Sequence, residues 1–291
     1  MTPRLPADRL RELSRRPAGA PPLVMVTAYD FTSARVAEAA GVDLILVGDS
    51  AGTTILGYQS TRDVGVDELL VLTRAAVRGV RETPVIGDLP FGTYEASDAL
   101  AVATARRFAE AGCAMVKLEG AGAMLDRVRA IVSAGIPVMG HVGLLPQSAE
   151  RADALRAQGR TAEAGLRIVD DAEALVQAGC TLLVVEAVPS AVAAACAERV
   201  LVPVIGIGAG AKVGGQVLVL HDLIGLTEGH TARFVRQYAQ VGQVMREAVA
   251  AWASDVRRGA YPASREEYGM PDDQAERFAA ALATRRGSSE G

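Results

Sequence analysis

The sequence predicts an α/β protein folded as a (β/α)8 barrel, the TIM barrel. Eight short apolar runs alternate with helical patterns along its 291 residues. Most of these runs are continuously apolar, as expected for parallel strands that are covered on both faces. Several runs end in a polar residue, and a barrel gathers the carboxyl ends of its strands at one rim. A doubly wound open sheet is the alternative that this alternation allows.

The elements are expected in the following order. A short amphipathic helix from Pro6 to Arg16 precedes a connector that reaches Pro22. The expected strands are Leu23–Ala28, Leu44–Gly48, Pro84–Asp88, Ala114–Glu119, Pro137–His141, Leu182–Ala187, Val204–Gly208 and Gln216–His221. The helices between them are Phe31–Ala40, Val66–Val80, Ser97–Ala111, Ala123–Ala134, Thr161–Ala178 and Ser190–Arg199. Ser97 and Ser190 are suitable N-caps for their helices.

After the last strand the sequence predicts a long helix and then a polar extension. The helical pattern runs from Thr231 to Arg257, and the turn at Gly259-Ala-Tyr-Pro262 ends it. We therefore divide the chain into an N-terminal helix and connector (1–22), the barrel (23–262) and a partly helical extension (263–291). We expect Arg285–Gly291 to be disordered.

Composition excludes several classes of protein. The net charge of −4 is small and spread along the chain, so no basic patch for nucleic acid is expected. No apolar run is long enough to cross a membrane, and the N-terminus lacks the apolar core of a secretory signal. The three cysteines, Cys113, Cys180 and Cys196, lack the spacing of metal ligands. They are expected to be reduced and buried in a cytoplasmic protein.

The segment Ala114–Gly120 is the clearest candidate for chemistry. Lys117 and Glu119 lie two residues apart, so in a strand they share one face. Burying an ammonium and a carboxylate on a core strand is costly unless both groups are paired or bound to something. Lys117 is therefore expected to hold an anionic group of a substrate or to offset an enolate. A structural ion pair with a carboxylate of the barrel is its alternative role.

Three carboxylates end consecutive strands and predict a metal site. Asp49, Asp88 and Glu119 follow the second, third and fourth strands. Oxygen donors that converge at a barrel rim suit Mg²⁺, which takes a few carboxylates and retains water ligands. Each carboxylate could instead cap the helix that follows it. Ser50 offers a hydroxyl and a backbone N–H to a substrate carboxylate, or could serve as an N-cap.

Two further residues at strand ends complete the candidate site. His141 ends the fifth strand, where a neutral imidazole can donate to a carbonyl or carboxylate, although a buried structural role is its alternative. Glu186 ends the sixth strand after four apolar residues. In an apolar pocket it would have a raised pKa and could act as a general base, and a salt bridge to an arginine is its alternative. His221 and His230 have no such support and are expected to be structural.

The glycine-rich segment Gly206–Ala211 superficially fits a dinucleotide fingerprint. That motif requires a following helix and an acidic residue about 20 positions later. Another strand follows instead, so the glycines are expected to bring backbone close to a ligand or to the next strand. A phosphate site after the seventh and eighth strands is a weaker possibility.

The sequence resembles ketopantoate hydroxymethyltransferase in motifs that follow one another from about residue 22 to 262. The matching segments are Thr27-Ala-Tyr-Asp30, Val47-Gly-Asp-Ser50, Gly57-Tyr-Gln-Ser-Thr61, Asp88-Leu-Pro-Phe91, Met115-Val-Lys-Leu-Glu-Gly120, Gly140-His-Val-Gly143, Pro146-Gln147, Glu186-Ala-Val-Pro189 and Ile205-Gly-Ile-Gly-Ala-Gly210. The chain departs from the family pattern at Ala187, Ala211 and Gly214, and these changes affect loop detail near the folate.

The resemblance implies a phosphoenolpyruvate/pyruvate-type barrel that assembles as a homodecamer. It implies transfer of a hydroxymethyl group from 5,10-methylenetetrahydrofolate to 3-methyl-2-oxobutanoate, with 2-dehydropantoate and tetrahydrofolate as products, in pantothenate and coenzyme A synthesis. The positions that match the family suggest Mg²⁺ ligands, 2-oxoacid contacts and a proton acceptor. These are Asp49, Asp88 and Glu119 for one Mg²⁺ per subunit; Asp49, Ser50, Asp88 and Lys117 for the 2-oxoacid; and Glu186 as the proton acceptor.

The expected mechanism is loss of the C3 proton to Glu186, with the enolate stabilised by Mg²⁺ and with Lys117 and His141 in support. Two alternatives remain open. One is a C–C lyase or phosphonate mutase of the same barrel superfamily, although the Lys-Xaa-Cys-Gly lid motif of those enzymes is not found in the sequence. The other is a non-catalytic barrel that serves as a ligand-binding protein or scaffold.

Overall fold

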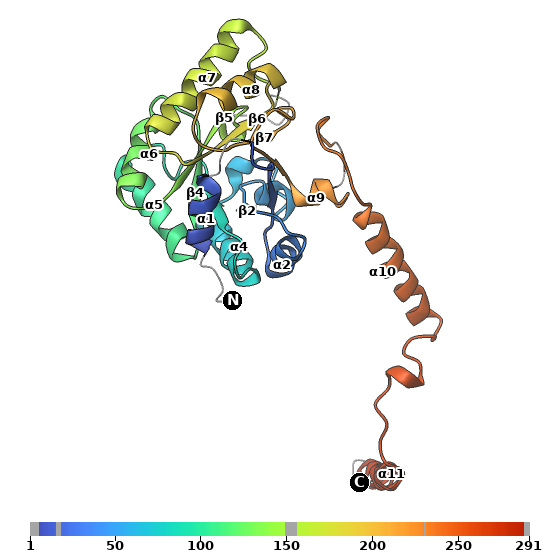
Figure 1. Ribbon diagram of the computed structural model, residues 1–291. Coiled ribbons are helices and arrows are strands. Elements are labelled where there is room, and N and C mark those ends of the chain that lie inside the picture. The colour runs from blue at the N-terminus through green and yellow to red at the C-terminus, as the bar shows by residue number, and fades with distance from the viewer. Residues whose placement is uncertain (1–5, 16–18, 149–155, 228, 230, 288–291) are drawn as a thin grey trace. The chain divides into compact units, whose positions relative to one another are not determined.

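Eight short strands pair in sequence order, and the last strand pairs with the first to close a barrel (Figure 1). The computed structural model describes residues 6–15, 19–148, 156–227, 229 and 231–287. All the strand pairs are parallel, and Leu23 of the first strand pairs with Gly215 of the eighth. The strands are β1 (Leu23–Thr27), β2 (Leu44–Val47), β3 (Val85–Asp88), β4 (Met115–Glu119), β5 (Val138–Gly143), β6 (Leu182–Glu186), β7 (Val204–Ile207) and β8 (Gly215–Leu218). The predicted barrel is confirmed, and the open sheet is excluded.

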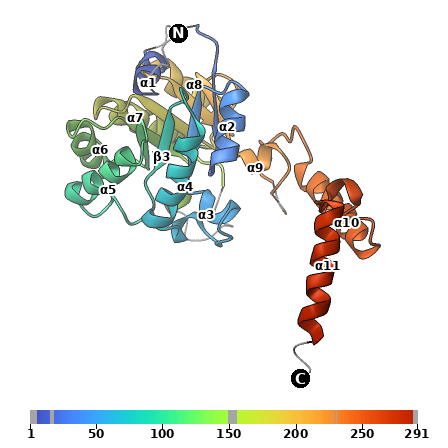
Figure 2. The same ribbon diagram turned by 90° about the horizontal axis from the view of Figure 1, so that it is seen from below.

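Helices follow most strands and surround the barrel, as Figure 2 shows from below. The long ones are α2 (Phe31–Ala39), α4 (Val66–Gly79), α5 (Asp98–Glu110), α6 (Met124–Ser133), α7 (Ala162–Gln177) and α8 (Ser190–Arg199). Short elements lie at the rim: α3 (Ala51–Thr54), α9 (Leu220–Leu223), and the 3₁₀ helices η1 (Thr61–Asp63) and η2 (Pro146–Ser148). The side chain of Ser97 caps α5 by accepting from Leu100 N–H. The predicted cap at Ser190 is wrong, because the carbonyl of Pro189 begins α8 and Ser190 is its first helical residue.

Strand alternation divides the apolar residues into two cores. One core lies between the sheet and the helices, and the other fills the barrel interior. The interior core takes alternate strand residues, such as Leu23 and Met25 of β1 and Leu44 and Leu46 of β2. Helix α1 (Pro6–Ser14) adds Leu10 and Leu13 to this interior core, so it closes the end of the barrel opposite the carboxyl ends of the strands.

The segment after β8 differs most from the prediction. Strand β8 stops at Leu218, and Leu220–Leu223 is helical instead of extended. Residues 231–240 are not helical, so the long helix begins ten residues later than expected, at Val241. Tertiary contacts explain the late start: Tyr238 N–H donates to the carbonyl of Leu223, and the ring of Phe234 lies against Gly208.

The chain forms two compact units, residues 1–239 and 240–291. The second unit contains α10 (Val241–Arg257), the 3₁₀ helix η4 (Ser264–Glu266) and α11 (Asp272–Gly287). Helix α11 includes the first residues of the segment that was expected to be disordered from Arg285, and the remainder of that segment lies outside the described residues. None of the helices in the described ranges is long and apolar enough to cross a membrane.

Candidate active site

The alternation that builds the interior core also places the predicted polar residues. Each polar residue follows an interior apolar residue of its own strand by an even number of positions. Its side chain therefore also points into the barrel, but nearer the carboxyl end of the strand. Ile86 precedes Asp88 in this way, Met115 precedes Lys117 and Glu119, Met139 precedes His141, and Val184 precedes Glu186. The strand register sets Asp88 beside Lys117 and Glu119 beside His141.

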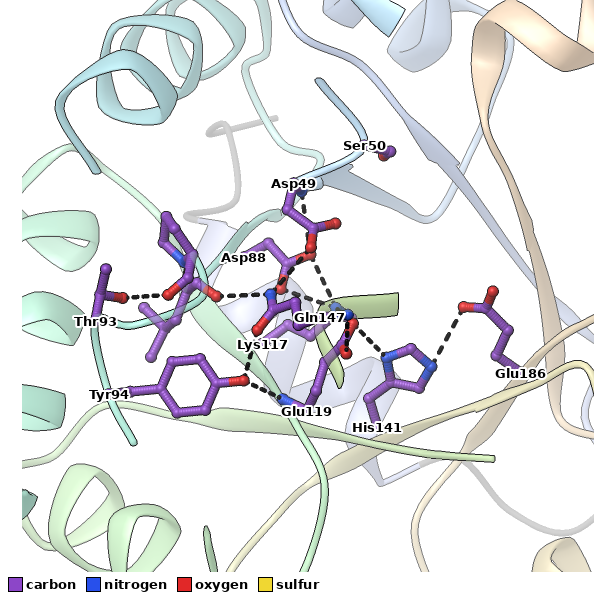
Figure 3. A network of polar contacts seen from close by, with 12 residues as sticks. Asp49, Ser50, Asp88, Thr93, Tyr94, Lys117, Glu119, His141, Gln147 and Glu186 are labelled. Atoms are coloured by element: carbon purple, nitrogen blue, oxygen red, sulfur yellow. Dashed lines mark hydrogen bonds and ion pairs between the residues drawn. The ribbon is translucent and has the colours of Figure 1, made fainter. Parts of the chain in front are cut away.

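These side chains face one cavity of about 120 Å³ at the carboxyl end of the barrel. Asp49 and Ser50, which follow β2, reach the same cavity (Figure 3). Its walls also contain apolar and small residues from strands and loops around the rim: Thr27, Leu46, Gly48, Thr61, Pro146, Val184, Ile207, Val217 and Val219. The structure therefore brings together all seven residues that the sequence predicted for the site.

The Lys117 ammonium lies among the carboxylates. Its Nζ donates to both oxygens of Asp88 at 2.8 Å and lies 3.5 Å from Glu119 Oε1. All three side chains are at most 5 % exposed. Burial alone would lower the pKa of Lys117, but the charges of Asp88, Glu119 and Asp49 outweigh it and raise that pKa. The structural ion pair considered for Lys117 is therefore present, inside the candidate site.

Repulsion among the carboxylates remains after Lys117 is counted. Burial, and then the charge of Asp88, raise the pKa of Asp49 well above its ordinary value. Burial and the charge of Glu119 raise the pKa of Asp88 despite the opposing effect of Lys117. Burial also acts to raise the pKa of Glu119, but the charges of Lys117 and His141 outweigh it and lower that pKa. Four carboxylates, those of Asp49, Asp88, Glu119 and Glu186, face the cationic groups of Lys117 and His141, so further positive charge would stabilise the site.

Gln147, at the centre of η2, contacts two of the carboxylates. Its Nε2 donates to Asp49 Oδ2 at 3.0 Å, and its backbone N–H donates to Glu119 Oε2 at 3.0 Å. The other oxygen of Glu119, Oε1, is buried without a hydrogen-bond partner among the described residues. Neither Asp49 nor Glu119 caps the helix that follows it, because their carboxylates are directed to this network.

His141 lies between two carboxylates. Its Nδ1 is 3.3 Å from Glu119 Oε1, and its Nε2 is 3.3 Å from Glu186 Oε2. In the described structure both nitrogens lack a well-aligned hydrogen bond, so these are charge contacts. Burial alone would lower the pKa of His141, but the carboxylates outweigh it, chiefly Glu119, and raise it to about 9. Glu186 faces this imidazole and is 18 % exposed, so its surroundings are not purely apolar.

Ser50 does not cap α3 with its side chain, although it occupies the N-cap position. Its Oγ lies 2.8 Å from the hydroxyl of Tyr29, a fully buried residue. Tyr29 therefore orients the Ser50 hydroxyl that reaches the cavity. The sequence did not predict this role of Tyr29.

A divalent cation fits the donors, although Lys117 occupies the position between Asp88 and Glu119. Within the described ranges, His, Cys, Asp and Glu side chains form no group of three already arranged as metal ligands. Glu119 Oε1 is nevertheless a buried anionic oxygen without a hydrogen bond, and burial, together with repulsion between carboxylates, raises the pKa of both Asp49 and Asp88. Buried carboxylates in this condition are suited to bind a hard cation such as Mg²⁺.

Two residues of the network were not predicted. Gln147 and Tyr94 come from loops, where no strand period indicates which way a side chain points. The only signal for Gln147 was its place in the Pro146-Gln147 motif. Outside the site, His221 packs against the Tyr29 ring with centroids 5.6 Å apart, whereas His230 lies outside the described residues.

Two other expectations concern the cysteines and the glycine-rich segment. The three cysteines are free thiols, and burial is confirmed for Cys180 and Cys196, whereas Cys113 is only half-buried. The glycine-rich segment leads from β7 to β8 without a helix, so it is not a dinucleotide fingerprint.

Comparison with known proteins identifies relatives over most of the chain. The family profile described as ketopantoate hydroxymethyltransferase matches residues 8–264. The 3-methyl-2-oxobutanoate hydroxymethyltransferase of Nitratidesulfovibrio vulgaris (strain DP4) is 52 % identical over 270 residues, which are 92 % of this chain and 88 % of the relative. The protein of the same name from Geobacillus kaustophilus (strain HTA426) is 45 % identical, and the match covers 87 % of this chain and 91 % of the relative.

Solved structures of low sequence identity share the fold. A phosphonopyruvate hydrolase in complex with oxalate and Mg²⁺ has a TM-score of 0.61 at 14 % identity, covering 96 % of this chain and 99 % of its own. Phosphoenolpyruvate phosphomutase from Streptomyces platensis subsp. rosaceus has a TM-score of 0.59 at 17 % identity, and the match covers 98 % of both chains. These likenesses show the barrel fold alone.

Proposed function

Because the chain belongs to the ketopantoate hydroxymethyltransferase family, we propose that its rim cavity makes a 2-oxoacid carbon nucleophilic. The enzyme is a 3-methyl-2-oxobutanoate hydroxymethyltransferase of pantothenate synthesis, and the product is 2-dehydropantoate. The one-carbon donor that we propose is 5,10-methylenetetrahydrofolate, and the metal is one Mg²⁺ per subunit held by Asp49, Asp88 and Glu119. When bound, Mg²⁺ supplies positive charge that stabilises negative charge developing on the oxygens of the 2-oxoacid.

The residues around the cavity orient the 2-oxoacid. The ammonium of Lys117, which also pairs with Asp88, can donate to the oxygens of the 2-oxoacid. Ser50, oriented by Tyr29, offers a hydroxyl to the substrate carboxylate. The apolar wall formed by Val184, Ile207 and Val217 would contact the substrate's branched carbon chain. Because these groups lie on different strands of one closed sheet or, like Ser50, shortly after a strand, their separations are held by the barrel.

Glu186 is the proposed proton acceptor. Its carboxylate takes the C3 proton, and the electron pair of the broken C–H bond passes into the ketoacid. One methylene C–N bond of methylenetetrahydrofolate breaks, its nitrogen takes up the proton removed from C3, and C3 forms a bond to the methylene carbon. Water then replaces the second nitrogen, giving its hydroxyl to the methylene carbon and its proton to that nitrogen, so that tetrahydrofolate leaves. His141, between Glu186 and Glu119, is proposed to hold the base in orientation and to keep its charge balanced.

One observation supports this proposal above all others. Ionisable side chains from β3, β4, β5 and β6 share the interior face of the barrel and meet in one buried cavity beside the end of β2. A structural core would not gather three carboxylates in this way, because burying them without a cation is costly. The low-identity lyases and mutases share only the fold, so no specific observation favours their reactions.

The test is a turnover assay with 3-methyl-2-oxobutanoate, methylenetetrahydrofolate and Mg²⁺. We expect 2-dehydropantoate only when both substrates are present, loss of turnover with a chelator, and recovery when Mg²⁺ is restored. Asp88→Ala is expected to lose Mg²⁺-dependent turnover. Unchanged turnover in the chelator would contradict the proposed role of the metal, and no turnover at all would contradict the proposed substrates.

The family resemblance also supports a homodecamer in the cytoplasm, which we propose as the working form. Light scattering of the purified protein would test its subunit number.

A further inference from the structure

We propose that Gln147 is the positioning residue for the carboxylates of the cation site. It is 2 % exposed and lies on η2, a short 3₁₀ helix after β5. It is therefore contributed by a loop and not by the strands that carry Asp88, Glu119 and Glu186. The proposal rests on the proposed function, because the carboxylates that it would position are those proposed to hold Mg²⁺.

Gln147 links two carboxylates that come from different strands. Its side-chain amide donates to Asp49 Oδ2 at 3.0 Å, and its backbone N–H donates to Glu119 Oε2 at 3.0 Å. The second amide proton is directed to the carbonyl of Leu89, also at 3.0 Å, so the residue after β3 is tied to the same side chain. One residue thus joins the ends of β2, β3 and β4.

Tyr94 fixes which way the amide of Gln147 faces. Its hydroxyl donates to Gln147 Oε1 at 2.6 Å and accepts from Glu119 N–H at 3.3 Å. Because the amide oxygen is held by this donor, the amide nitrogen must face Asp49 and Leu89. The Tyr94 ring is 2 % exposed, so the hydroxyl is held in place by packing. A flipped amide would set its oxygen against the Asp49 carboxylate, which is unfavourable.

The arrangement determines which carboxylate oxygens remain for a cation. Gln147 occupies Asp49 Oδ2 and Glu119 Oε2. Glu119 Oε1 has no hydrogen bond in the described structure, and its charged neighbours are Lys117 Nζ at 3.5 Å and His141 Nδ1 at 3.3 Å. A carboxylate that uses one oxygen for a fixed donor loses rotational freedom and presents the other oxygen in a set direction. Partners of this kind typically change metal affinity by about 10- to 100-fold when they are removed.

The experiment measures Mg²⁺ binding by titration calorimetry, without substrates, in variants of the full chain. Gln147→Met keeps the length of the side chain and the backbone N–H, but removes the amide. Gln147→Leu also keeps the backbone N–H and removes the amide, and it adds no charge. Both are expected to weaken Mg²⁺ binding by about 10- to 100-fold. Tyr94→Phe, which only frees the amide to turn, is expected to produce a smaller loss in the same direction.

Thr104→Val is the matched control, because Thr104 donates a part-buried hydrogen bond to the carbonyl of Thr93, next to Tyr94, and has no hydrogen bond to a carboxylate among the described residues. It is expected to bind Mg²⁺ like the wild type. Thermal unfolding in chelator measures the fold of each variant separately, and Tyr94→Phe provides the test if the Gln147 variants do not fold. Folded Gln147 or Tyr94 variants with wild-type Mg²⁺ affinity would overturn the proposal, even if their unfolding temperature falls.

Failure of the proposed function would give a different result. If Asp88→Ala binds Mg²⁺ as tightly as the wild type, or the wild type binds none, the carboxylates are not the cation site. Both proposals are then overturned. If the wild type binds Mg²⁺, Asp88→Ala does not, and the Gln147 variants bind normally, only the role of Gln147 is overturned.

Discussion

At the residue scale, Glu186 is the side chain whose chemistry is easiest to isolate. It ends β6, and its Oε2 lies 3.3 Å from His141 Nε2. Among the described residues it has no hydrogen bond or ion pair with Lys117 or with the other carboxylates. A change at this residue should therefore affect proton transfer more than substrate binding. The same cannot be expected of Asp88 or Lys117, because each would leave a buried charge without its partner.

Glu186→Gln is expected to lower kcat by about 10²- to 10⁴-fold, the range typical of a lost general base. The dissociation constant of 3-methyl-2-oxobutanoate, measured by calorimetry with Mg²⁺, is expected to stay within a few-fold of the wild type. Glu173→Gln is the control, because Glu173 pairs with Arg199 on the helical side of the barrel. A normal kcat in Glu186→Gln would remove Glu186 as the base.

The residues of the site that could be predicted were those on strands. Lys117 and Glu119 share a face because strands alternate with a period of two, and this period extends from the apolar core to the rim. Gln147 and Tyr94 could not be predicted, because loops have no fixed period and their partners lie 25 to 98 residues away in sequence. The environment of Glu186 also could not be predicted, because it depends on His141 of the neighbouring strand β5.

At the scale of elements, the junction of β5 and β6 controls where Glu186 lies. Gly143 has φ +97°, and a Cβ built there would lie 2.3 Å from the carbonyl oxygen of Glu186. The next residue after the base, Ala187, also has a positive φ of 47°. The backbone around the proposed base is therefore closely packed and has little room for change.

Gly143→Ala is expected to lower the free energy of unfolding by at least about 1–3 kcal/mol and to reduce turnover as well. Gly135→Ala is the matched control, because Gly135 has φ +83° but nothing within 4 Å of an added Cβ. It is expected to lose stability through backbone strain alone, with turnover unchanged. Urea unfolding and the turnover assay measure the two effects, and equal turnover in both variants would contradict this account.

The carboxylate of Glu38 in helix α2 accepts hydrogen bonds from the segment before β3, and this contact should depend on pH. Glu38 accepts N–H donors from Arg81, Glu82 and Thr83 at 2.9–3.0 Å. Burial alone would raise the pKa of Glu38, but these hydrogen bonds outweigh it and lower that pKa below its ordinary value of 4.5. Because the folded-state pKa is depressed, the stabilisation is present above about pH 4.5 and is lost as the pH falls through the folded-state pKa.

Glu38→Gln is therefore expected to lower the free energy of unfolding at pH 7, with the difference from the wild type shrinking below about pH 4.5. Urea unfolding at several pH values measures this difference in the free energy of unfolding. The exposed Glu82→Gln serves as the control and should show no such dependence. A difference that persists unchanged at acid pH would mean that the charge of Glu38 does not stabilise this contact.

Element boundaries were predictable where local chemistry sets them. Ser97 caps α5 as its sequence indicates, because a serine before a helical run accepts from the first turn. The segment from Thr231 was not predictable, because its helical pattern is overridden by contacts of Tyr238 with Leu223 and of Phe234 with Gly208. Such contacts join residues that become neighbours only once the barrel has formed.

At the scale of the whole molecule, closure of the barrel creates the site. Pairing of β8 with β1 brings the carboxyl ends of all the strands to one rim, so that residues from Asp49 to Glu186 meet in a single cavity. The alternation of strands and helices also allowed an open sheet, and the polar residues at the strand ends favoured the barrel, which gathers those ends at one rim.

The most direct measurement is exchange of the C3 proton of 3-methyl-2-oxobutanoate with deuterium, followed by NMR in D2O without folate. With the wild-type enzyme and Mg²⁺ we expect exchange at C3, loss of exchange when a chelator is added, and recovery when Mg²⁺ is restored. Exchange that continues at the same rate in the chelator, or no exchange by an enzyme that completes turnover, would contradict the claim that a cation and a base activate this carbon.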